Sequence, residues 1–371
     1  MSEASMAGST LHWDWGTAYD LFISLDVLHE PSDYGVRPKW AAGVRARLPA
    51  DARQMLEEAQ SLFSHRPLHW VHSLPDPKDG ATALWVLGRT PPASRLEALS
   101  LLPRAPAVVK EILHSVAERQ TWNEDQAQAL RAAYETDQGD TCLTDQSLAN
   151  MLKWWSRADE FGERYLAALQ SYQDVFFAEE EERIRPDLLA ALARAQDLAN
   201  RMALPELFEE LSQGLRFGEL DRVAEWVLAP SFWSTPLVCL GQAGPDRNIM
   251  LFGARPADAS LVPGEVVPET LLRTLKALSD PTRLRILRLL AEESLTPAEL
   301  SRQLRLRPQT VIHHLQILRL AGLVQVTVGD GKGRAGEPHA ARFEAMSAAL
   351  ASLHDFLLIE ETEGFRDRPG R

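Results

Sequence analysis

The side chains best suited to binding a nucleic acid lie between residues 302 and 334. The amides of Gln309 and Gln316 can hydrogen-bond to base edges, and Ile312 can contact a thymine methyl group. Arginines around them can bind phosphates, which sets the register of a protein on DNA without reading sequence. The candidate DNA-contacting residues are Arg302, Arg305, Arg307, Gln309, Thr310, Ile312, His313, His314, Gln316, Arg319, Lys332 and Arg334.

One amphipathic helix must carry most of these side chains. Pro308 suits a first helical position, and Gly322 suits the position just after the last turn. Val311, Leu315 and Leu318 share one face and predict the side that packs on a core. The polar side chains named above then point away from that core, and the segment 308–314 is where a base-reading surface is expected.

The flanking sequence predicts the elements that hold this helix. Asp280 and Pro281 open a helix expected to bury Leu284, Leu287 and Leu290. Thr296-Pro297-Ala298-Glu299 is a capping box that starts a short helix ending near Leu304. A further helix is expected over 270–278.

The sequence after Gly322 predicts a hairpin and a last helix. Residues 323–328 alternate between apolar and polar side chains, a glycine-rich tip follows, and a return strand is expected around 341–345. A closing amphipathic helix is expected over 347–359. Two short helices followed by a hairpin are the parts of a winged helix-turn-helix, whose second helix enters the major groove.

The order of these motifs resembles the ArsR family of bacterial regulators. The matching pieces are L-S-D-P-T-R-L-R-I-L at 278–287, the T-x-x-E-L helix, and T-V-x-H-H-L-x-x-L-x-x-A-G-L-V at 310–324. The resemblance implies that Pro308–His314 is the recognition segment and that Lys332 and Arg334 lie on the wing. It also implies that the helices at 270–278 and 347–359 supply dimer contacts.

Two features depart from the family pattern. Arg307, Pro308 and Ile312 stand where small polar residues are usual, so an operator preference cannot be transferred. The wing is also longer and richer in glycine. The opening around Trp13-Asp14-Trp15, with AEWVLAPSFWSTPLV and LFGARP later, resembles more faintly an uncharacterised domain that precedes such DNA-binding heads in some bacterial regulators.

Charge is distributed unevenly along the chain. The net charge of −13 argues against nucleic-acid binding if taken as a whole. Residues 273–342, however, carry 12 Lys and Arg against 6 Asp and Glu, whereas residues 1–265 carry 24 against 39. Because the charge close to the phosphates is what matters, this asymmetry permits DNA binding.

The expected fold is mainly α: a helical N-terminal domain with a small β-hairpin element, and a C-terminal winged helix-turn-helix. The expected boundaries are a regulatory or dimerisation domain over 1–256 with short strands near 222–254, a linker over 257–268, a DNA-binding domain over 269–360 and a flexible tail over 361–371. In the second half of the N-terminal domain, GQAGPDRN separates two apolar runs and predicts a hairpin.

No metal, cofactor or catalytic site is expected. The helix before the recognition helix has no cysteine, and His354 and Asp355 are adjacent, so they project about 100° apart. His65, His69 and His72 share a spacing that could bind zinc only in an uninterrupted helix, and Pro67 breaks it. Cys142 and Cys239 are most simply isolated thiols. No phosphate loop, nucleophile elbow or dinucleotide motif is present.

These observations predict a sequence-specific transcriptional regulator, expected to be a repressor. We expect a cytoplasmic, nucleoid-associated homodimer with no signal peptide or membrane span, and a double-stranded DNA operator as its partner. The N-terminal domain would sense an unknown signal, such as a small-molecule effector, or would oligomerise. The alternatives are a winged-helix dimerisation or protein-binding module without DNA binding, and an enzyme with a DNA-binding tail.

Overall fold

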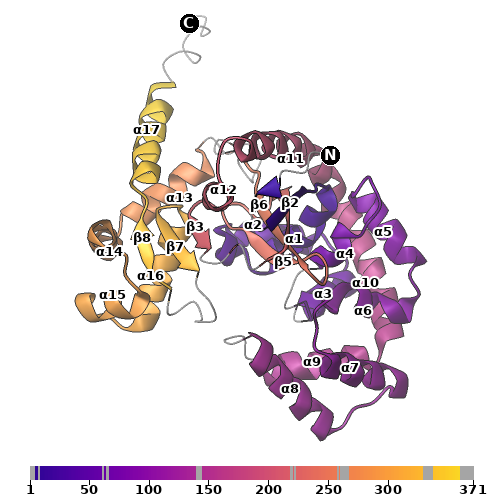
Figure 1. Cartoon of the computed structure of the whole chain (residues 1–371). Helices are drawn as coiled ribbons and strands as arrows, with labels where there is room; N and C mark the ends of the chain where they lie inside the picture. The colour runs from indigo at the N-terminus through magenta and orange to yellow at the C-terminus, as the bar shows by residue number, and fades with distance from the viewer. Residues whose placement is uncertain are drawn as a thin grey trace, which may run out of the picture. The chain divides into compact units, whose positions relative to one another are not determined.

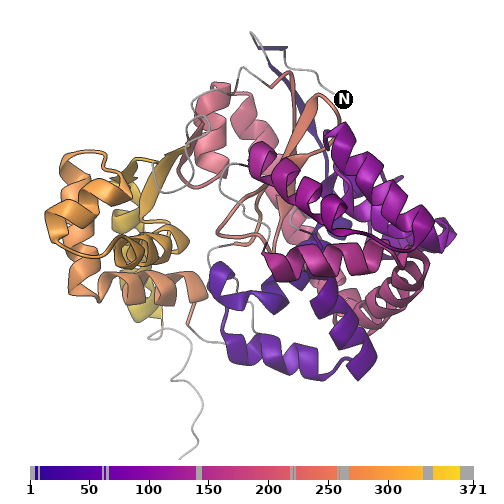
Figure 2. The same ribbon diagram turned by 90° about the horizontal axis from the view of Figure 1, so that it is seen from below.

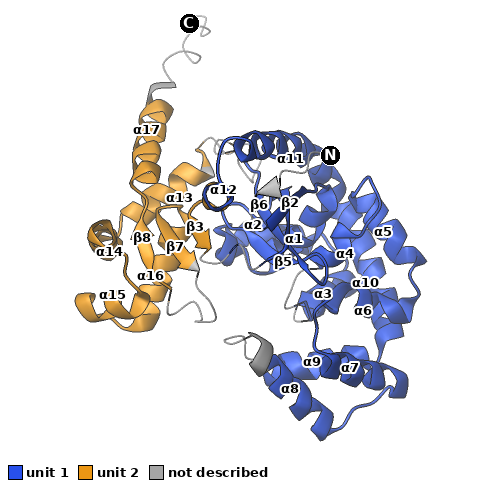
Figure 3. Cartoon of the chain, in the orientation of Figure 1, with its two compact units in different colours: residues 1–207, 219–255 blue, residues 208–218, 256–371 orange. Residues whose placement is uncertain are grey.

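The chain forms two compact units, shown in different colours in Figure 3. The structure is a computed structural model that describes residues 5–6, 9–60, 62–63, 67–138, 144–217, 220, 223–256, 259, 267–328 and 337–359. Unit 1 comprises Met1–Leu207 and Glu219–Arg255, and unit 2 comprises Phe208–Gly218 and Pro256–Arg371. The expected domain border near residue 256 coincides with a unit border, but residues 208–218 belong with the C-terminal unit. Most of the expected linker and all of the expected tail lie outside the described residues.

A five-stranded sheet runs through unit 1. Its strands are β1 (Ser5–Met6), β2 (Ser9–Trp13), β4 (Glu225–Ser231), β5 (Cys239–Gln242) and β6 (Arg247–Gly253), in the order β1-β2-β4-β6-β5. The predicted hairpin is present as the antiparallel pair β5 and β6. Strands β2, β4 and β6 are parallel to one another, and the participation of β2 was not predicted from the sequence.

Helices make up most of unit 1, which confirms the mainly α prediction (Figure 1). Their bounds are α1 Thr17–His29, α2 Pro38–Ala46, α3 Ala50–Gln60, α4 Leu68–His72, α5 Gly80–Arg89, α6 Pro92–Ser100, α7 Ala107–Arg119, α8 Glu124–Gln138, α9 Asp145–Trp155, α10 Ala158–Tyr172, α11 Ala178–Ala199 and α12 Leu204–Leu211, with a 3₁₀ turn at Pro31–Tyr34 and a π-helical turn at Gln173–Phe177. The last residues of α12 belong to unit 2. Helices α7, α8 and α9 pack on one another, and α9 also contacts α10 (Figures 1 and 2).

Helix α1 is the centre of unit 1 and is buried on nearly every side. It packs on β4 and on α2, α3, α4, α5 and α11. The buried carboxylate of Asp20 accepts hydrogen bonds from the Ser231 hydroxyl and from the backbone N–H groups of Phe232 and Trp233, and so holds the turn after β4. Burial raises the pKa of Asp20 to about 6.

Unit 2 contains the elements predicted for a winged helix. They are α13 (Glu269–Leu278), α14 (Pro281–Glu292), α15 (Pro297–Leu304), α16 (Pro308–Leu320), β7 (Val324–Val328), β8 (His339–Ala341) and α17 (Phe343–Ile359). An additional strand, β3 (Leu215–Phe217), pairs in parallel with β7, so the sheet order is β3-β7-β8. In the part of the chain that the structure describes, no helix has the length and apolar character needed to cross a membrane.

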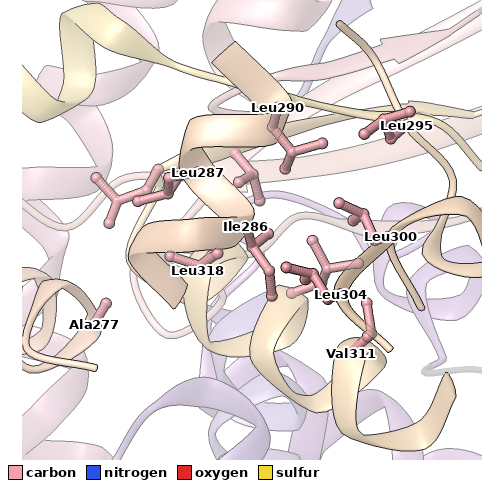
Figure 4. Packing of buried hydrophobic residues seen from close by; sticks show 12 residues of the cluster. Ala277, Ile286, Leu287, Leu290, Leu295, Leu300, Leu304, Val311 and Leu318 are labelled. Atoms are coloured by element: carbon pink, nitrogen blue, oxygen red, sulfur yellow. The ribbon is translucent and has the colours of Figure 1, made fainter. Parts of the chain in front are cut away.

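The core of unit 2 lies between α14, α15 and α16. Ile286 and Leu290 of α14 meet Leu300 of α15 and the predicted stripe on α16, as the close-up in Figure 4 shows. Val311 and Leu318 are fully buried, so the face assigned to α16 from the sequence is correct.

Three details differ from the sequence prediction. Leu284 is 49% exposed, and Ile286 takes its place in the core because the buried stripe of α14 is rotated from the expected one. The return strand comes earlier than expected, at His339–Ala341, where Leu295 and His339 also exchange backbone hydrogen bonds of 2.9 and 2.8 Å. Helix α17 therefore begins four residues earlier, at Phe343.

The capping box at Thr296 provides a test of local stability. Its hydroxyl accepts a hydrogen bond from the Glu299 N–H, and the Glu299 carboxylate accepts one from the Thr296 N–H at 2.8 Å. Thr296→Ala should lower the free energy of unfolding of unit 2 by about 1 kcal/mol, since a helix N–H loses its partner. Hydrogen exchange of the unit 2 amides measures this. Thr296→Ser keeps the hydroxyl and serves as the control; an equal loss in both variants would rule out the cap as the cause.

Candidate nucleic-acid interface

The turn between α15 and α16 is fixed by short-range hydrogen bonds. Arg305 ends α15 in the left-handed conformation (φ 57°), and the Leu306 N–H donates to the Ser301 carbonyl at 3.1 Å. The buried Ser301 hydroxyl donates back to the Leu306 carbonyl at 2.6 Å. Pro308 then occupies the first turn of α16. This arrangement sets the direction in which α16 leaves the turn.

One face of α16 is open to solvent. Gln309, Thr310, His313 and Gln316 are exposed, and Ile312 is 38% exposed. The opposite face is the buried stripe of Val311, Leu315 and Leu318. The structure thus places five of the predicted DNA-contacting side chains together on one accessible helical surface.

Three arginines surround the beginning of this surface. Arg302 lies on α15, Arg305 ends it, and Arg307 precedes α16; all three are exposed. None of their guanidinium groups forms a hydrogen bond or ion pair with another of the described residues. Their N–H groups are therefore available to phosphate, which suits the role predicted for them.

Arg319 has a different environment from the one expected. It was predicted to flank the reading surface and meet phosphate. Instead its guanidinium donates to the carbonyls of Gln213 at 2.7 Å and Ser212 at 3.0 Å, and the side chain is half-buried. Burial, with a contribution from Arg342, lowers the pKa of Arg319 to about 10, so it is still charged at neutral pH. The carbonyls of residues 212 and 213 thus occupy its guanidinium.

His314 is also separate from the exposed surface. The ring is half-buried near Asp280 and Arg283, at the start of α14. Its Nδ1 is buried and has no hydrogen-bond partner among the described residues. Burial lowers its pKa, against the opposing effect of Asp280. The predicted DNA contact at His314 is therefore not favoured by its position.

Lys332 and Arg334 lie outside the described residues, between the ends of β7 and β8. The contacts that the turn before β3 makes with α16 were not predicted from the sequence. The pair Gln213-Gly214 followed by Leu-Arg-Phe is a turn and strand signal that could have indicated this turn.

Two of the three histidines considered for metal binding contact other groups. His69 contacts the Ala98 carbonyl at 3.1 Å, and the His72 Nδ1 lies 2.8 Å from Asp14. Cys239 is buried, whereas His65 and Cys142 fall outside the described residues. No group of three or more His, Cys, Asp or Glu side chains with metal-binding geometry occurs within the ranges that the structure describes.

Comparison with known proteins identifies one part of the chain. Residues 280–326 match the family described as "Bacterial regulatory protein, arsR family". The match covers α14, α15, α16 and the beginning of β7, so this part of unit 2 is an ArsR-type helix-turn-helix. No family matches the large N-terminal region. Searches of curated proteins and of solved structures found no match to the chain.

The buried His339 and the half-buried His314 predict that unit 2 loses stability in mild acid. Burial lowers the folded-state pKa of both His314 and His339 from the ordinary value of 6.5. The unfolded chain therefore binds protons more readily, and the stability that the neutral rings contribute above pH 6.5 is lost progressively as the pH falls from that value through the lower folded-state pKa. Hydrogen exchange measures the free energy of unfolding of unit 2. Between pH 7.5 and about 5.5, this free energy should fall more in the wild type than in His339→Gln.

The exposed His354 provides the matched control for this comparison. His354→Gln should follow the wild type across the same pH range. A pH dependence in His339→Gln as steep as that of the wild type would show that other groups control the effect.

Proposed function

We propose that this chain is a sequence-specific transcription regulator that reads an operator with the exposed surface of α16. The proposal rests on one observation: within an ArsR-type helix-turn-helix, α16 has a buried apolar face and, on the opposite side, an exposed face of mainly polar side chains. One face is sealed into the core, and the other presents amide, imidazole and aliphatic side chains that fit base edges in the major groove.

Electrostatics support this orientation. Arg302, Arg305 and Arg307 lie around the amino-terminal end of α16, where a recognition helix approaches the phosphates on either side of the groove. The excess of basic residues over 273–342 contrasts with the acidic residues 1–265. Negative DNA would therefore be attracted to one end of the sequence and repelled by the remainder, which favours a defined docking orientation.

The exposed apolar residues of α17 support the proposal that the protein acts as a homodimer. Phe343, Leu350 and Leu357 recur every seven residues and are 59%, 58% and 64% exposed. Met346 and Leu353 fall between them at heptad spacing and are half-buried. An apolar seam of period seven is the pattern by which two helices pair along their length. Two copies joined in this way would present two α16 helices to successive half-sites.

We further propose that binding represses transcription and that unit 1 has a regulatory rather than a catalytic role. The winged-helix elements from α13 to α17 span only residues 269–359, and unit 1 is far larger. Helix α1 and its buried Asp20 give unit 1 a core of its own, on which a sensor or oligomerisation domain can be built. Derepression of a reporter gene in a strain lacking the protein would support repression; reduced expression would indicate activation.

The DNA-reading surface can be tested with two kinds of substitution. A duplex selected by the wild-type protein from a random library, and a shuffled duplex of equal composition, serve as probes. Gln309→Ala with His313→Ala should weaken binding to the selected duplex by roughly 10- to 100-fold, because base contacts are lost, with little effect on the shuffled one. Arg305→Ala should weaken both alike and make the salt dependence shallower by about one phosphate contact.

Electrophoretic or fluorescence titrations across salt concentrations measure both effects. Thr282→Ala, on α14 and outside the set of predicted DNA-contacting residues, is a control that should match the wild type. Equal losses on the two duplexes for every variant would show that the reading surface lies elsewhere.

The dimer seam makes a separate prediction. Leu350→Glu should convert a dimer into a 41.4 kDa monomer, because a carboxylate would be buried in an apolar seam. Sedimentation velocity or light scattering measures the mass. Ser352→Glu places the same charge at an exposed position off the seam and should leave the dimer intact. A wild-type chain that is monomeric at micromolar concentration would refute this part of the proposal.

A further inference from the structure

Residues 208–217 form a small folded segment within unit 2, here called the docking segment. Phe208 and Phe217 make an edge-to-face ring contact at 5.5 Å, and Glu209 pairs with Arg216 at 2.7 Å. The buried Ser212 hydroxyl accepts a hydrogen bond from the Leu215 N–H at 2.9 Å. These contacts give the segment a definite shape, so it can act as a rigid support.

The docking segment holds the carboxyl-terminal end of α16. The Arg319 guanidinium donates to the carbonyls of both Ser212 and Gln213. Arg342, which precedes α17, donates to the Gln213 carbonyl at 2.9 Å and to the Gly322 carbonyl at 3.1 Å. Two cations therefore converge on one backbone turn, and the acceptors of all these bonds are carbonyl oxygens.

The same segment also holds the first strand of the wing. Residues Leu215–Phe217 pair with Val326–Val328, and the Val326 N–H donates to the Gly214 carbonyl at 3.0 Å. Gly214 has a φ of 100°, and a Cβ there would lie 2.9 Å from the Arg342 side chain and 3.0 Å from the Gln325 Cβ. Only glycine fits this approach without displacement.

We infer that the docking segment is a working part of the DNA reader and that Arg319 is a positioning residue that sets α16 relative to the wing. The inference rests on the proposed function. Three consecutive residues, 212–214, bond to the end of α16 and to β7, so a shift of this turn changes both DNA-facing elements together. The chain continues from both ends of the docking segment into unit 1, at Leu207 and Glu219. A rearrangement in unit 1 can thus reach α16 through the covalent chain.

Arg319→Ala in the full chain tests the positioning role. Against the selected and shuffled duplexes, it should lower the ratio of the two affinities by roughly tenfold, the equivalent of one lost base contact. It should leave the salt dependence on the shuffled duplex unchanged, because no phosphate contact is removed. Arg319→Lys, which keeps a donor for the carbonyls, should restore much of the ratio.

Arg305→Ala is the matched arginine control, since the Arg305 side chain is exposed and its guanidinium has no hydrogen-bond or ion-pair partner among the described residues. It should reduce affinity for both duplexes and make the salt dependence shallower. If Arg319→Ala behaves in the same way, Arg319 contacts phosphate and the inference is wrong. The inference would also be wrong if Arg319→Ala had the same ratio of affinities for the two duplexes as the wild type.

Gly214→Ala provides a second variant in case Arg319→Ala does not fold. It displaces the docking segment without altering any side chain of α16, and it should lower the same affinity ratio. Gly43→Ala, where an added Cβ meets nothing within 4 Å, is its matched control. If both glycine variants lower the ratio of the affinities for the selected and shuffled duplexes, or if neither does, the inference is wrong.

Hydrogen exchange without DNA separates this inference from the proposed function. Both Arg319→Ala and Gly214→Ala should raise exchange at Val326 and its neighbours in β7, whereas Arg305→Ala should not. If the wild-type protein binds neither duplex, the proposed function fails, and exchange in β7 still decides whether Arg319 holds the docking segment. Unchanged protection of β7 in Arg319→Ala would show that it does not.

Discussion

Burial of one face of α16 is the constraint on which the DNA-binding unit depends. Val311, Leu315 and Leu318 are removed from water against α14 and α15, and their burial fixes the rotation of the helix about its own axis. Since successive side chains are 100° apart, that rotation decides which residues remain exposed. The polar surface is therefore a consequence of the apolar one: a helix rotated by one residue would lose both its core and its reading face.

The elements of unit 2 could be predicted because their signals are local. Asp280 and the Thr296–Glu299 capping box mark two helix starts within four residues each, and Gly322 marks an end with a φ of 69°. The error at Leu284 arose where several leucines allow two apolar stripes, and only the packing partners decide between them. The error at Arg319 has another origin, since its partners are more than 100 residues away in sequence.

Unit 1 was harder to derive from sequence because its sheet is built from distant segments. Strand β2 pairs with β4 across more than 200 residues, and a five-residue run at the start of the chain has no pattern that indicates such a partner. The local hairpin of β5 and β6 was predictable from its turn residues. The role of Asp20 also emerges only in three dimensions, where a lone carboxylate meets the turn that follows β4.

The origin of β3 limits how separable the DNA-binding unit is. In the order β3-β7-β8, strand β7 has a neighbour on each side, and one of them comes from before the last strands of unit 1. A fragment cut at residue 256 would leave the backbone groups along one edge of β7 unpaired, and exposed sheet edges of this kind can pair with strands of other molecules. In such a fragment the first strand of the wing, β7, would also lack its pairing with β3. Although its motifs occupy a contiguous stretch of sequence, the reader is therefore not a detachable module.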